Sequence, residues 1–172
     1  MSQAMRTAYL PNAHRGPAWD GARDLLSRPP ATEPSLEYLR AEQSVRDFIA
    51  RYAFTLDRGD VDGLMQFFAA DCVMTNQRGT FATPAEMRAE YEGIVRNVPH
   101  RMHLLSNLLV RFADDLATAT VSYYFRAVLE PPGGPPRSLG GIILDQLRND
   151  AGAWRIYRRN VSIDFDTELS IG

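Results

Sequence analysis

The sequence contains no lysine and only one cysteine. All 19 of its basic residues are arginine, and the 21 acidic residues leave a formal net charge of -2. This balance gives no electrostatic reason to bind nucleic acid or an anionic membrane, so neither is expected as a partner. Because Cys72 is alone, an internal disulfide and a thiolate metal cluster are both excluded.

Long apolar segments are lacking as well. The first residues, MSQAMRTAYLPNAHRG, have no apolar core of the kind that an export signal needs. No later run approaches the ~20 apolar residues of a membrane span. These absences predict a cytoplasmic protein. A chain of 172 residues, 45% of them hydrophobic, has the size and composition of one globular domain.

Proline is concentrated at the start of the chain, at Pro11, Pro17, Pro29, Pro30 and Pro34. This composition predicts an N-terminal arm over residues 1–34, either mobile or packed across a neighbour. The domain itself is predicted over residues 35–166, followed by a short tail at 167–172.

Helical periodicity dominates the first half of the domain. Ser35 is a candidate N-cap for a long amphipathic helix that ends near Gly59, and Asp60 is a candidate cap for a second helix over residues 61–71. The sequence TPAE, from Thr83, is a capping box that predicts a third helix to about residue 95. The apolar face of the first helix has the expected spacing, with Val45, Phe48, Ile49, Tyr52, Ala53 and Leu56.

After His100 the pattern changes to the two-residue alternation of strands. Four strands are predicted, at residues 101–112, 116–130, 138–148 and 153–165, after short strands at 72–76 and 80–82. Helices followed by an antiparallel meander indicate an α+β fold. We expect three helices packed on a curved, mainly antiparallel sheet, forming a cone-shaped α+β barrel that encloses a pocket.

One arginine stands on an otherwise apolar face of the last predicted strand. That face comprises Tyr157, Arg159, Val161, Ile163 and Phe165. A guanidinium cannot lose its charge, so Arg159 needs an anionic or carbonyl partner. A structural ion pair with an acid of the same core and a substrate-binding role both remain open.

Asp57 lies in the last turn of the first helix, where the helix dipole disfavours a carboxylate. Another group should therefore hold it there, unless it is an ordinary loop acid. Tyr52 lies in the middle of the apolar stripe of the same helix. It is either a core aromatic with a bonded hydroxyl or a site residue.

His103 opens an apolar strand and shares its predicted face with Leu105, Asn107 and Leu109. It is either a satisfied core histidine or a catalytic base. His100 and His103 would point to opposite faces of the strand, so no metal site is indicated. Cys72 is predicted to be a small core residue.

The stretch RYAFTLDRGDVDGLMQFFAADCVM, with the capping-box helix and the meander after it, resembles the SnoaL-like branch of the nuclear transport factor 2 superfamily. The resemblance covers residues 40–165 in order. The opening stretch is also similar to bacterial ketosteroid isomerase, whose helix tyrosine corresponds to Tyr52. The carboxylate base of that enzyme falls at Asn76, which cannot take a proton, so this resemblance argues against steroid isomerisation by that route.

A closer similarity is to the dehydratase and dehydrochlorinase members: scytalone dehydratase, bile-acid 7α-dehydratase and hexachlorocyclohexane dehydrochlorinase. These resemblances imply a catalytic aspartate at Asp57 and a catalytic histidine at His103, in HLLSNLLVRF. The bile-acid dehydratase also has a tyrosine, which corresponds to Tyr52, and an arginine on its last strand. In the similarity to the dehydrochlorinase, that arginine corresponds to Arg159, within WRIYRRN. Its lysine corresponds to Tyr52, which argues against halide chemistry.

The resemblance therefore implies a lyase of dehydratase type, or an isomerase or cyclase, that needs no cofactor. Asp57 would orient His103, which removes a proton from carbon, while Arg159 and Tyr52 would stabilise the developing oxyanion. The substrate is expected to be a hydrophobic polycyclic or aromatic small molecule. The predicted pocket walls are Phe48, Phe67, Phe68, Met74, Tyr91, Asn107, Tyr123 and Phe125.

A non-catalytic role is the alternative, either ligand binding or assembly, as in the small subunit of a ring-hydroxylating oxygenase. Self-association is expected in either case, because the run VSYYFRAVL is too apolar to face water on both sides of a sheet. We expect a homotrimer, with a dimer as the other possibility and with the N-terminal arm reaching a neighbour.

Overall fold

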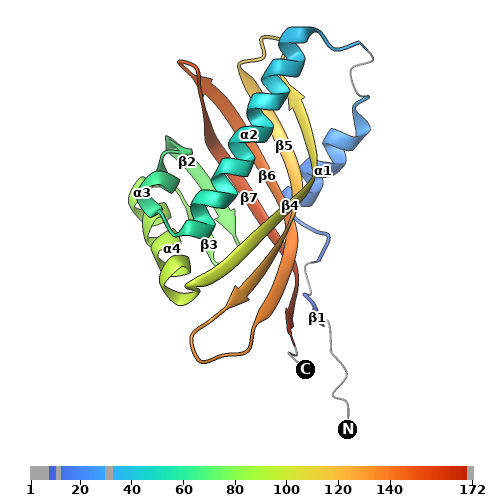
Figure 1. The fold of residues 1–172 in the computed structure, drawn as a ribbon. Helices are drawn as coiled ribbons and strands as arrows, with labels where there is room; N and C mark the ends of the chain where they lie inside the picture. Colours follow the sequence, from blue (N-terminus) through green and yellow to red (C-terminus); the bar gives the residue numbers. More distant parts are fainter. Residues whose placement is uncertain (1–7, 11–12, 30–32, 170–172) are drawn as a thin grey trace.

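A computed structural model describes residues 8–10, 13–29 and 33–169 (Figure 1). Pro11 and Pro30 of the predicted arm lie outside the described residues, as does the end of the predicted tail.

The described residues form one mixed, mainly antiparallel sheet of seven strands. Its order is β3-β2-β7-β6-β5-β4, and β1 pairs with β7 outside this order. β2 runs parallel to β7, and the other pairings are antiparallel. The strands are β1 (Ala8–Tyr9), β2 (Phe68–Asn76), β3 (Gly79–Phe81), β4 (His100–Phe112), β5 (Thr118–Glu130), β6 (Arg137–Asp150) and β7 (Ala153–Glu168). The predicted α+β class and the four-strand meander are confirmed, although the curved sheet stays open.

The helix boundaries follow from local capping. The Ser35 side chain accepts a hydrogen bond from the backbone N–H of Tyr38, and Gly59 ends the helix in the left-handed region, with φ of 74°. Thr83 and Glu86 form the predicted capping box. The helices are α1 (Pro17–Ser27), α2 (Leu36–Arg58), α3 (Val61–Met65) and α4 (Pro84–Asn97).

The second predicted helix is much shorter than expected. It ends at Met65, and residues 68–71 belong to strand β2 instead. Phe68 pairs with Ile156 of β7, a partner that lies far away in the sequence. The prediction of a helix over residues 61–71 was wrong because this long-range pairing overrides the local helical spacing.

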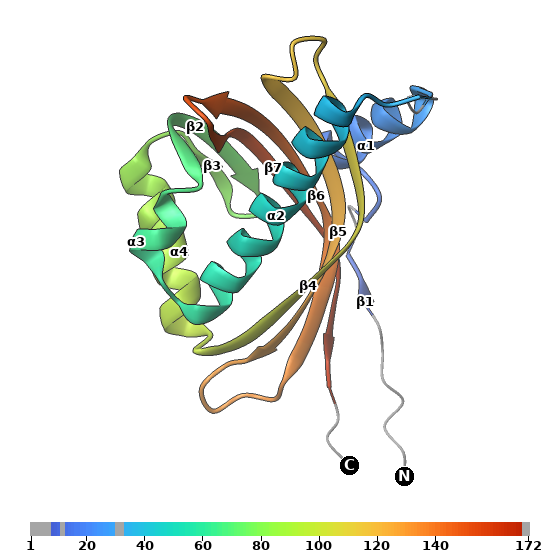
Figure 2. The same ribbon diagram turned by 45° about the horizontal axis from the view of Figure 1, so that its top comes forward.

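The two faces of the sheet carry different helices. Figures 1 and 2 show α2, α3 and α4 on one side, which we call the inner face, and α1 on the other. The larger apolar core lies under α2, α3 and α4 and includes Ile143 of β6. A smaller core joins α1 to the outer face through the neighbouring residues Ile142 and Leu144. This alternation along β6 places the inner face and its cavity beneath α2 and α4.

The described part of the N-terminal segment packs on its own sheet. The indole N–H of Trp19 donates to the buried carboxylate of Asp164 on β7, at 3.0 Å. The backbone N–H of His14 donates to the same carboxylate at 3.1 Å. A Cβ on Gly21 would collide with Leu144, so glycine permits the close approach of α1 to β6. The described part of this segment therefore contacts its own sheet, and its predicted contact with a neighbouring chain stays a prediction.

Candidate active site

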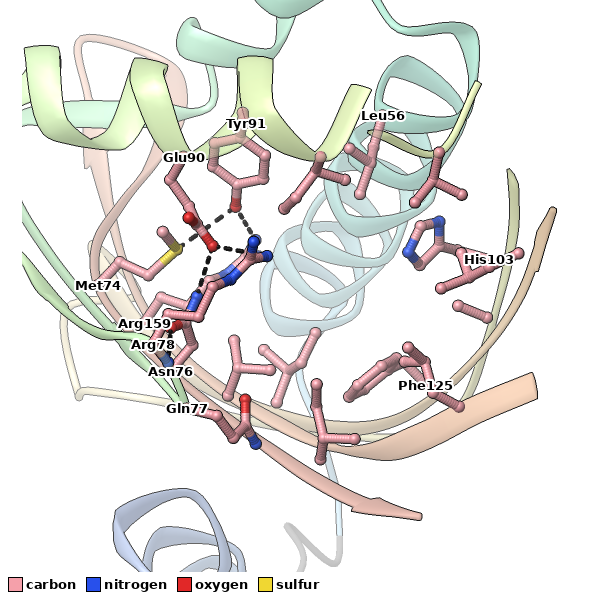
Figure 3. A pocket seen from close by; sticks show the side chains of 18 of the residues that line it. Leu56, Met74, Asn76, Gln77, Arg78, Glu90, Tyr91, His103, Phe125 and Arg159 are labelled. Atoms are coloured by element: carbon pink, nitrogen blue, oxygen red, sulfur yellow. Dashed lines mark hydrogen bonds and ion pairs between the residues drawn. The ribbon is translucent and has the colours of Figure 1, made fainter. Parts of the chain in front are cut away.

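A cavity of about 330 Å³ lies between α2, α4 and the inner face of the sheet (Figure 3). Its size is near the lower end of the range for small-molecule pockets. Six of the predicted site residues line it: Tyr52, Met74, Tyr91, His103, Phe125 and Arg159. Much of the remaining wall is aliphatic, with Leu56, Leu105, Leu139, Ile143, Val161 and Ile163.

Asp57 and His103 form a hydrogen-bonded pair at the wall of this cavity. His103 Nδ1 lies 2.6 Å from Asp57 Oδ1, and the backbone N–H of His103 donates to Asp57 Oδ2 at 2.9 Å. The side chain of His103 is only 15% exposed, and that of Asp57 is 21% exposed. The expected contact is present, and it explains how a carboxylate is kept in the last turn of α2.

Arg101 helps to fix the same junction between α2 and β4. Its Nε–H donates to the carbonyl of Leu56 at 2.8 Å, and its Nη1 donates to the carbonyl of Val98 at 2.7 Å. These bonds satisfy carbonyl groups at the ends of α2 and α4. β4 is thereby attached to both helices two residues before His103.

The contacts of Asp57 select one tautomer of the imidazole. A carboxylate only accepts hydrogen bonds, so the proton of neutral His103 lies on Nδ1. The lone pair is then on Nε2. Figure 3 shows the ring of His103 on one side of the cavity, with Glu90, Tyr91 and Arg159 on the opposite side. Because Asp57 is not among the lining residues, it lies behind the imidazole as an orienting partner.

Arg159 is held in the core by Asp145. The two side chains are 1% and 0% exposed, and both Asp145 oxygens accept hydrogen bonds from Arg159, each at 2.7 Å. Arg159 Nη2 also donates to Tyr123 Oη at 3.0 Å, and Tyr123 donates to Asp145 at 2.8 Å. Burial alone would lower the pKa of the guanidinium, but the charge of Asp145 and the electrostatic interactions with Tyr123, Tyr52 and Tyr91 together outweigh burial, so the pKa is raised. The structural ion pair considered from the sequence is therefore present.

Arg159 also lines the cavity, where it contacts two tyrosines. Its Nη1 donates to Tyr91 Oη at 3.2 Å, and its guanidinium carbon lies 4.2 Å from the centre of the Tyr52 ring. Four of its five N–H groups are thus used by described residues. Tyr52 Oη and Tyr91 Oη are 3.0 Å apart. Burial raises the pKa of Tyr91 well above its usual value, so this hydroxyl remains protonated at neutral pH.

A second polar group in the cavity wall joins α4 to the β2–β3 turn. Glu90 Oε1 accepts a hydrogen bond from Asn76 Nδ2 at 3.0 Å and forms an ion pair with Arg78 Nη2 at 2.9 Å. The Glu90 side chain is 8% exposed. All three residues line the cavity. Asn76 was not predicted to have a role of its own, and Arg78 and Glu90 were not predicted as site residues.

Three predicted wall residues lie outside the cavity. Phe48 and Phe67 pack against each other, with ring centres 5.1 Å apart, and border a separate hollow beside Trp154. Asn107 is exposed and has a left-handed backbone, with φ of 54°. It lies at a bulge in β4, between Ser106 and Leu109, where the pairing with β5 shifts. Beyond the bulge, Leu108 packs on the inner core and Leu109 on the outer one, so the predicted face is interrupted at Asn107.

Two further predicted wall residues lie behind Arg159 and not in the wall itself. The ring centre of Phe68 is 5.3 Å from the guanidinium carbon, and Tyr123 is bonded within the ion pair with Asp145. Both are buried, and neither lines the cavity. Phe68 and Tyr123 pack around the Arg159–Asp145 ion pair, whereas Tyr52 and Tyr91 line the cavity in front of it.

Asp145 is the main functional residue that sequence reasoning missed. Its signal was a carboxylate inside the apolar run GGIILDQL. Glu90 gave no comparable signal, because an acid on an amphipathic helix is ordinarily solvated.

The single cysteine is structural. Burial raises the pKa of the Cys72 thiol to about 12, and its side chain is packed in the inner core. Within residues 8–10, 13–29 and 33–169, no group of three or more His, Cys, Asp or Glu side chains could hold a metal ion. None of the helices in this described part combines the length and apolarity required to span a membrane.

Comparison with known proteins agrees with this architecture. Residues 37–160 match the family model of the SnoaL-like domain. No curated protein matches the sequence. The structure is similar to a putative scytalone dehydratase from Novosphingobium aromaticivorans, with a TM-score of 0.71 and 20% identity over 78% of this chain and 91% of that one.

Two other solved structures show the same fold. Hexachlorocyclohexane dehydrochlorinase LinA-type3 from Novosphingobium barchaimii has a TM-score of 0.70 and 15% identity, covering 78% of this chain and 94% of that one. A putative aromatic ring hydroxylase from Novosphingobium aromaticivorans has a TM-score of 0.67 and 21% identity, covering 74% of this chain and 90% of that one. At these identities the similarity shows a shared fold, and the fold alone does not select one reaction.

Proposed function

The chain belongs to the SnoaL-like domain family, and from that premise and the geometry of its cavity we propose that it is a lyase of dehydratase type, or an isomerase or cyclase, that needs no cofactor. The hydrogen bond between Asp57 and His103 at the wall of a mainly apolar cavity carries the proposal. It supplies an oriented base in an environment where few other groups could bind the proton.

His103 Nε2 removes a proton from a carbon next to a carbonyl group. Asp57 fixes the tautomer and stabilises the imidazolium that forms. In a dehydration, the proton taken by His103 is delivered to the hydroxyl that leaves the neighbouring carbon. Water then departs and no net proton is consumed. If the proton returns to another carbon, the same residues catalyse an isomerisation.

The carbonyl oxygen becomes negatively charged as the proton leaves. Tyr52 and Tyr91 supply hydroxyl groups at the cavity wall, and the charge of Arg159 beside them favours a developing anion. Because the pKa of Tyr91 is raised, the hydroxyl acts as a hydrogen-bond donor and not as a phenolate. The proposed role of Arg159 is therefore indirect, exerted largely through the tyrosines.

The substrate class follows from the cavity walls. A volume of about 330 Å³ with a largely aliphatic and aromatic lining suits a molecule of about two fused rings. We therefore propose a β-hydroxy ketone on a bicyclic or aromatic frame as the substrate type.

A direct test uses a synthetic bicyclic β-hydroxy ketone. Loss of water gives a conjugated enone, which is followed by its ultraviolet absorbance, and exchange of the acidic C–H is followed by NMR in deuterated water. We expect wild-type protein to accelerate both reactions and His103→Ala to lose on the order of 10²–10⁴-fold in rate. His100→Ala is the matched control, because His100 is an exposed histidine on the same strand.

The non-catalytic alternative predicts a different result. A ligand-binding or assembly subunit would bind the ketone without exchange or elimination in the wild-type protein. Equal rates for wild type and His103→Ala would also contradict the proposal.

A further inference from the structure

We infer that Asn76, Arg78 and Glu90 form a subsite that recognises a neutral hydroxyl group at the end of the ligand farthest from His103. This inference rests on the proposed function for the position of the reacting carbon, and it adds the chemistry of the opposite end of the ligand. The three residues line the same cavity as His103. In Figure 3 they lie across the cavity from its imidazole.

The hydrogen bonds of Glu90 leave one acceptor open. Oε1 accepts a hydrogen bond from Asn76 and forms an ion pair with Arg78, whereas the structure gives Oε2 no hydrogen bond to any described residue. The side chain is more than nine-tenths buried and lines the cavity, so bulk water solvates it poorly. Oε2 itself is not fully buried, so a ligand in the cavity can reach it, and a ligand group that donates a hydrogen bond would satisfy this acceptor.

Arg78 limits which donor fits. Its guanidinium lies at the same wall and uses Nη2 for Glu90, so further N–H groups remain to donate. Its charge compensates that of Glu90 and disfavours a ligand cation. A ligand anion would instead be repelled by the carboxylate. A hydroxyl donates to Glu90 Oε2 and accepts from Arg78, so it matches both members of the pair. A carbonyl oxygen would satisfy Arg78 alone.

Asn76 is the positioning residue of this subsite. Its Oδ1 accepts the backbone N–H of Arg78 at 2.7 Å, while its Nδ2 donates to Glu90. One amide therefore fixes the β2–β3 turn and the carboxylate of α4 relative to each other. Asn76 thus has a positioning role here, at the position where the ketosteroid isomerase resemblance would require a catalytic base.

The test compares two probes of nearly equal shape by isothermal titration calorimetry. One is a tetralone with a hydroxyl para to its carbonyl, and the other is its methyl ether, which cannot donate a hydrogen bond. We expect the wild-type protein to bind the phenol about tenfold or more tightly than the ether, the effect of a hydrogen bond to a charged group. Glu90→Gln should bring this ratio close to one.

Two further variants control the result. Arg78→Gln changes a half-exposed side chain and should also lower the ratio, so the test does not depend on the folding of one variant. Glu92→Gln, on the same helix but outside the cavity lining, should leave the ratio unchanged. Equal binding of both probes by the wild type, an unchanged ratio in Glu90→Gln, or no binding of either probe at millimolar concentration would overturn the inference.

The outcome is separable from that of the proposed function. A phenol preference that depends on Glu90, without proton exchange, supports the subsite and contradicts the lyase. Proton exchange that depends on His103, without a phenol preference, contradicts the subsite alone.

Discussion

Replacement of Asp145 by asparagine isolates the energetic role of the buried ion pair. Asp145 accepts two hydrogen bonds from Arg159 and one from Tyr123, and it is fully buried. Asparagine removes the negative charge and one acceptor oxygen, and leaves the guanidinium uncompensated. Breaking a buried pair in this way costs about 3–5 kcal/mol.

This loss is large compared with the roughly 5–15 kcal/mol that separates folded from unfolded states in ordinary proteins. For a chain of this length, each kcal/mol corresponds to roughly 2–4 °C in Tm. The expected decrease in Tm is therefore about 6–20 °C, measured by circular dichroism melts and checked by urea titration. Asp71→Asn is the control, because Asp71 pairs with Arg148 on the surface and its loss should change Tm little.

The double variant Asp145→Leu/Arg159→Met separates folding from catalysis. Replacing both charges with apolar side chains removes the unpaired ion, so most of the lost stability should return. If Arg159 acts through Tyr91 on the oxyanion, this stable variant should still lose on the order of 10²–10³-fold in rate. A Tm change of less than about 2 °C in Asp145→Asn would refute the energetic argument. Full activity in a folded double variant would refute the role of Arg159 in the reaction.

Four other predictions concern the dyad, alkaline pH, the Cys72 thiol and assembly. Asp57→Asn should reduce proton exchange nearly as much as His103→Ala while both variants keep most of their Tm; early melting with retained exchange would contradict this. Burial raises the pKa of Tyr91 and Tyr123, so the unfolded chain releases these protons from about pH 10 while the folded chain retains them. The contribution of these two tyrosines to the free energy of unfolding should therefore be fully present below that pH and be lost above it, as measured in urea titrations. Tyr91→Phe should make the free energy of unfolding fall less steeply with pH. The Cys72 thiol, with its pKa raised to about 12, should resist alkylation at neutral pH in the native protein and react only when it unfolds. We propose a homotrimer, because apolar side chains on β4 and β5 remain exposed; a monomer by light scattering at micromolar concentration would exclude it.

Features that depend on a few neighbouring residues could be predicted from the sequence. Ser35, Gly59 and the Thr83–Glu86 capping box act within one helical turn, and each occurs where predicted. The four strands of the meander are also local, because each shows its own alternation and short turns connect most of them. The helix predicted over residues 61–71 failed for the opposite reason, since residues 68–71 belong to strand β2, which pairs with the distant β7.

The polar site was predictable as a set of exceptions to these patterns. Asp57, His103 and Arg159 were each recognised because they occupy positions where the local pattern calls for another residue type. Their partners were harder to find, because hydrogen-bond geometry depends on register. Glu90 illustrates this limit: its burial depends on the β2–β3 turn, which packs against α4 through Asn76 and Arg78.

The register of the last hairpin decides which arginine enters the core. Near the turn, Asp150 pairs with Ala153 and Leu147 pairs with Ile156. Continued without interruption, the same register would place Asp145 opposite Arg158. A bulge between Gln146 and Leu147 shifts the pairing by one residue, so that Asp145 faces Arg159.

The bulge also changes which side chains of β7 face the cavity. Trp154 and Ile156 lie in the inner core before it, and Val161 and Ile163 pack on that core after it. Strict alternation would assign these two pairs to opposite faces of the sheet. In β4, the bulge at Asn107 likewise exchanges the inward-facing and outward-facing positions, and His103, which faces the cavity, lies before this bulge. Because each bulge sets the orientation of an entire half-strand, these two positions determine which side chains of β4 and β7 face the cavity, and periodicity alone cannot reveal them.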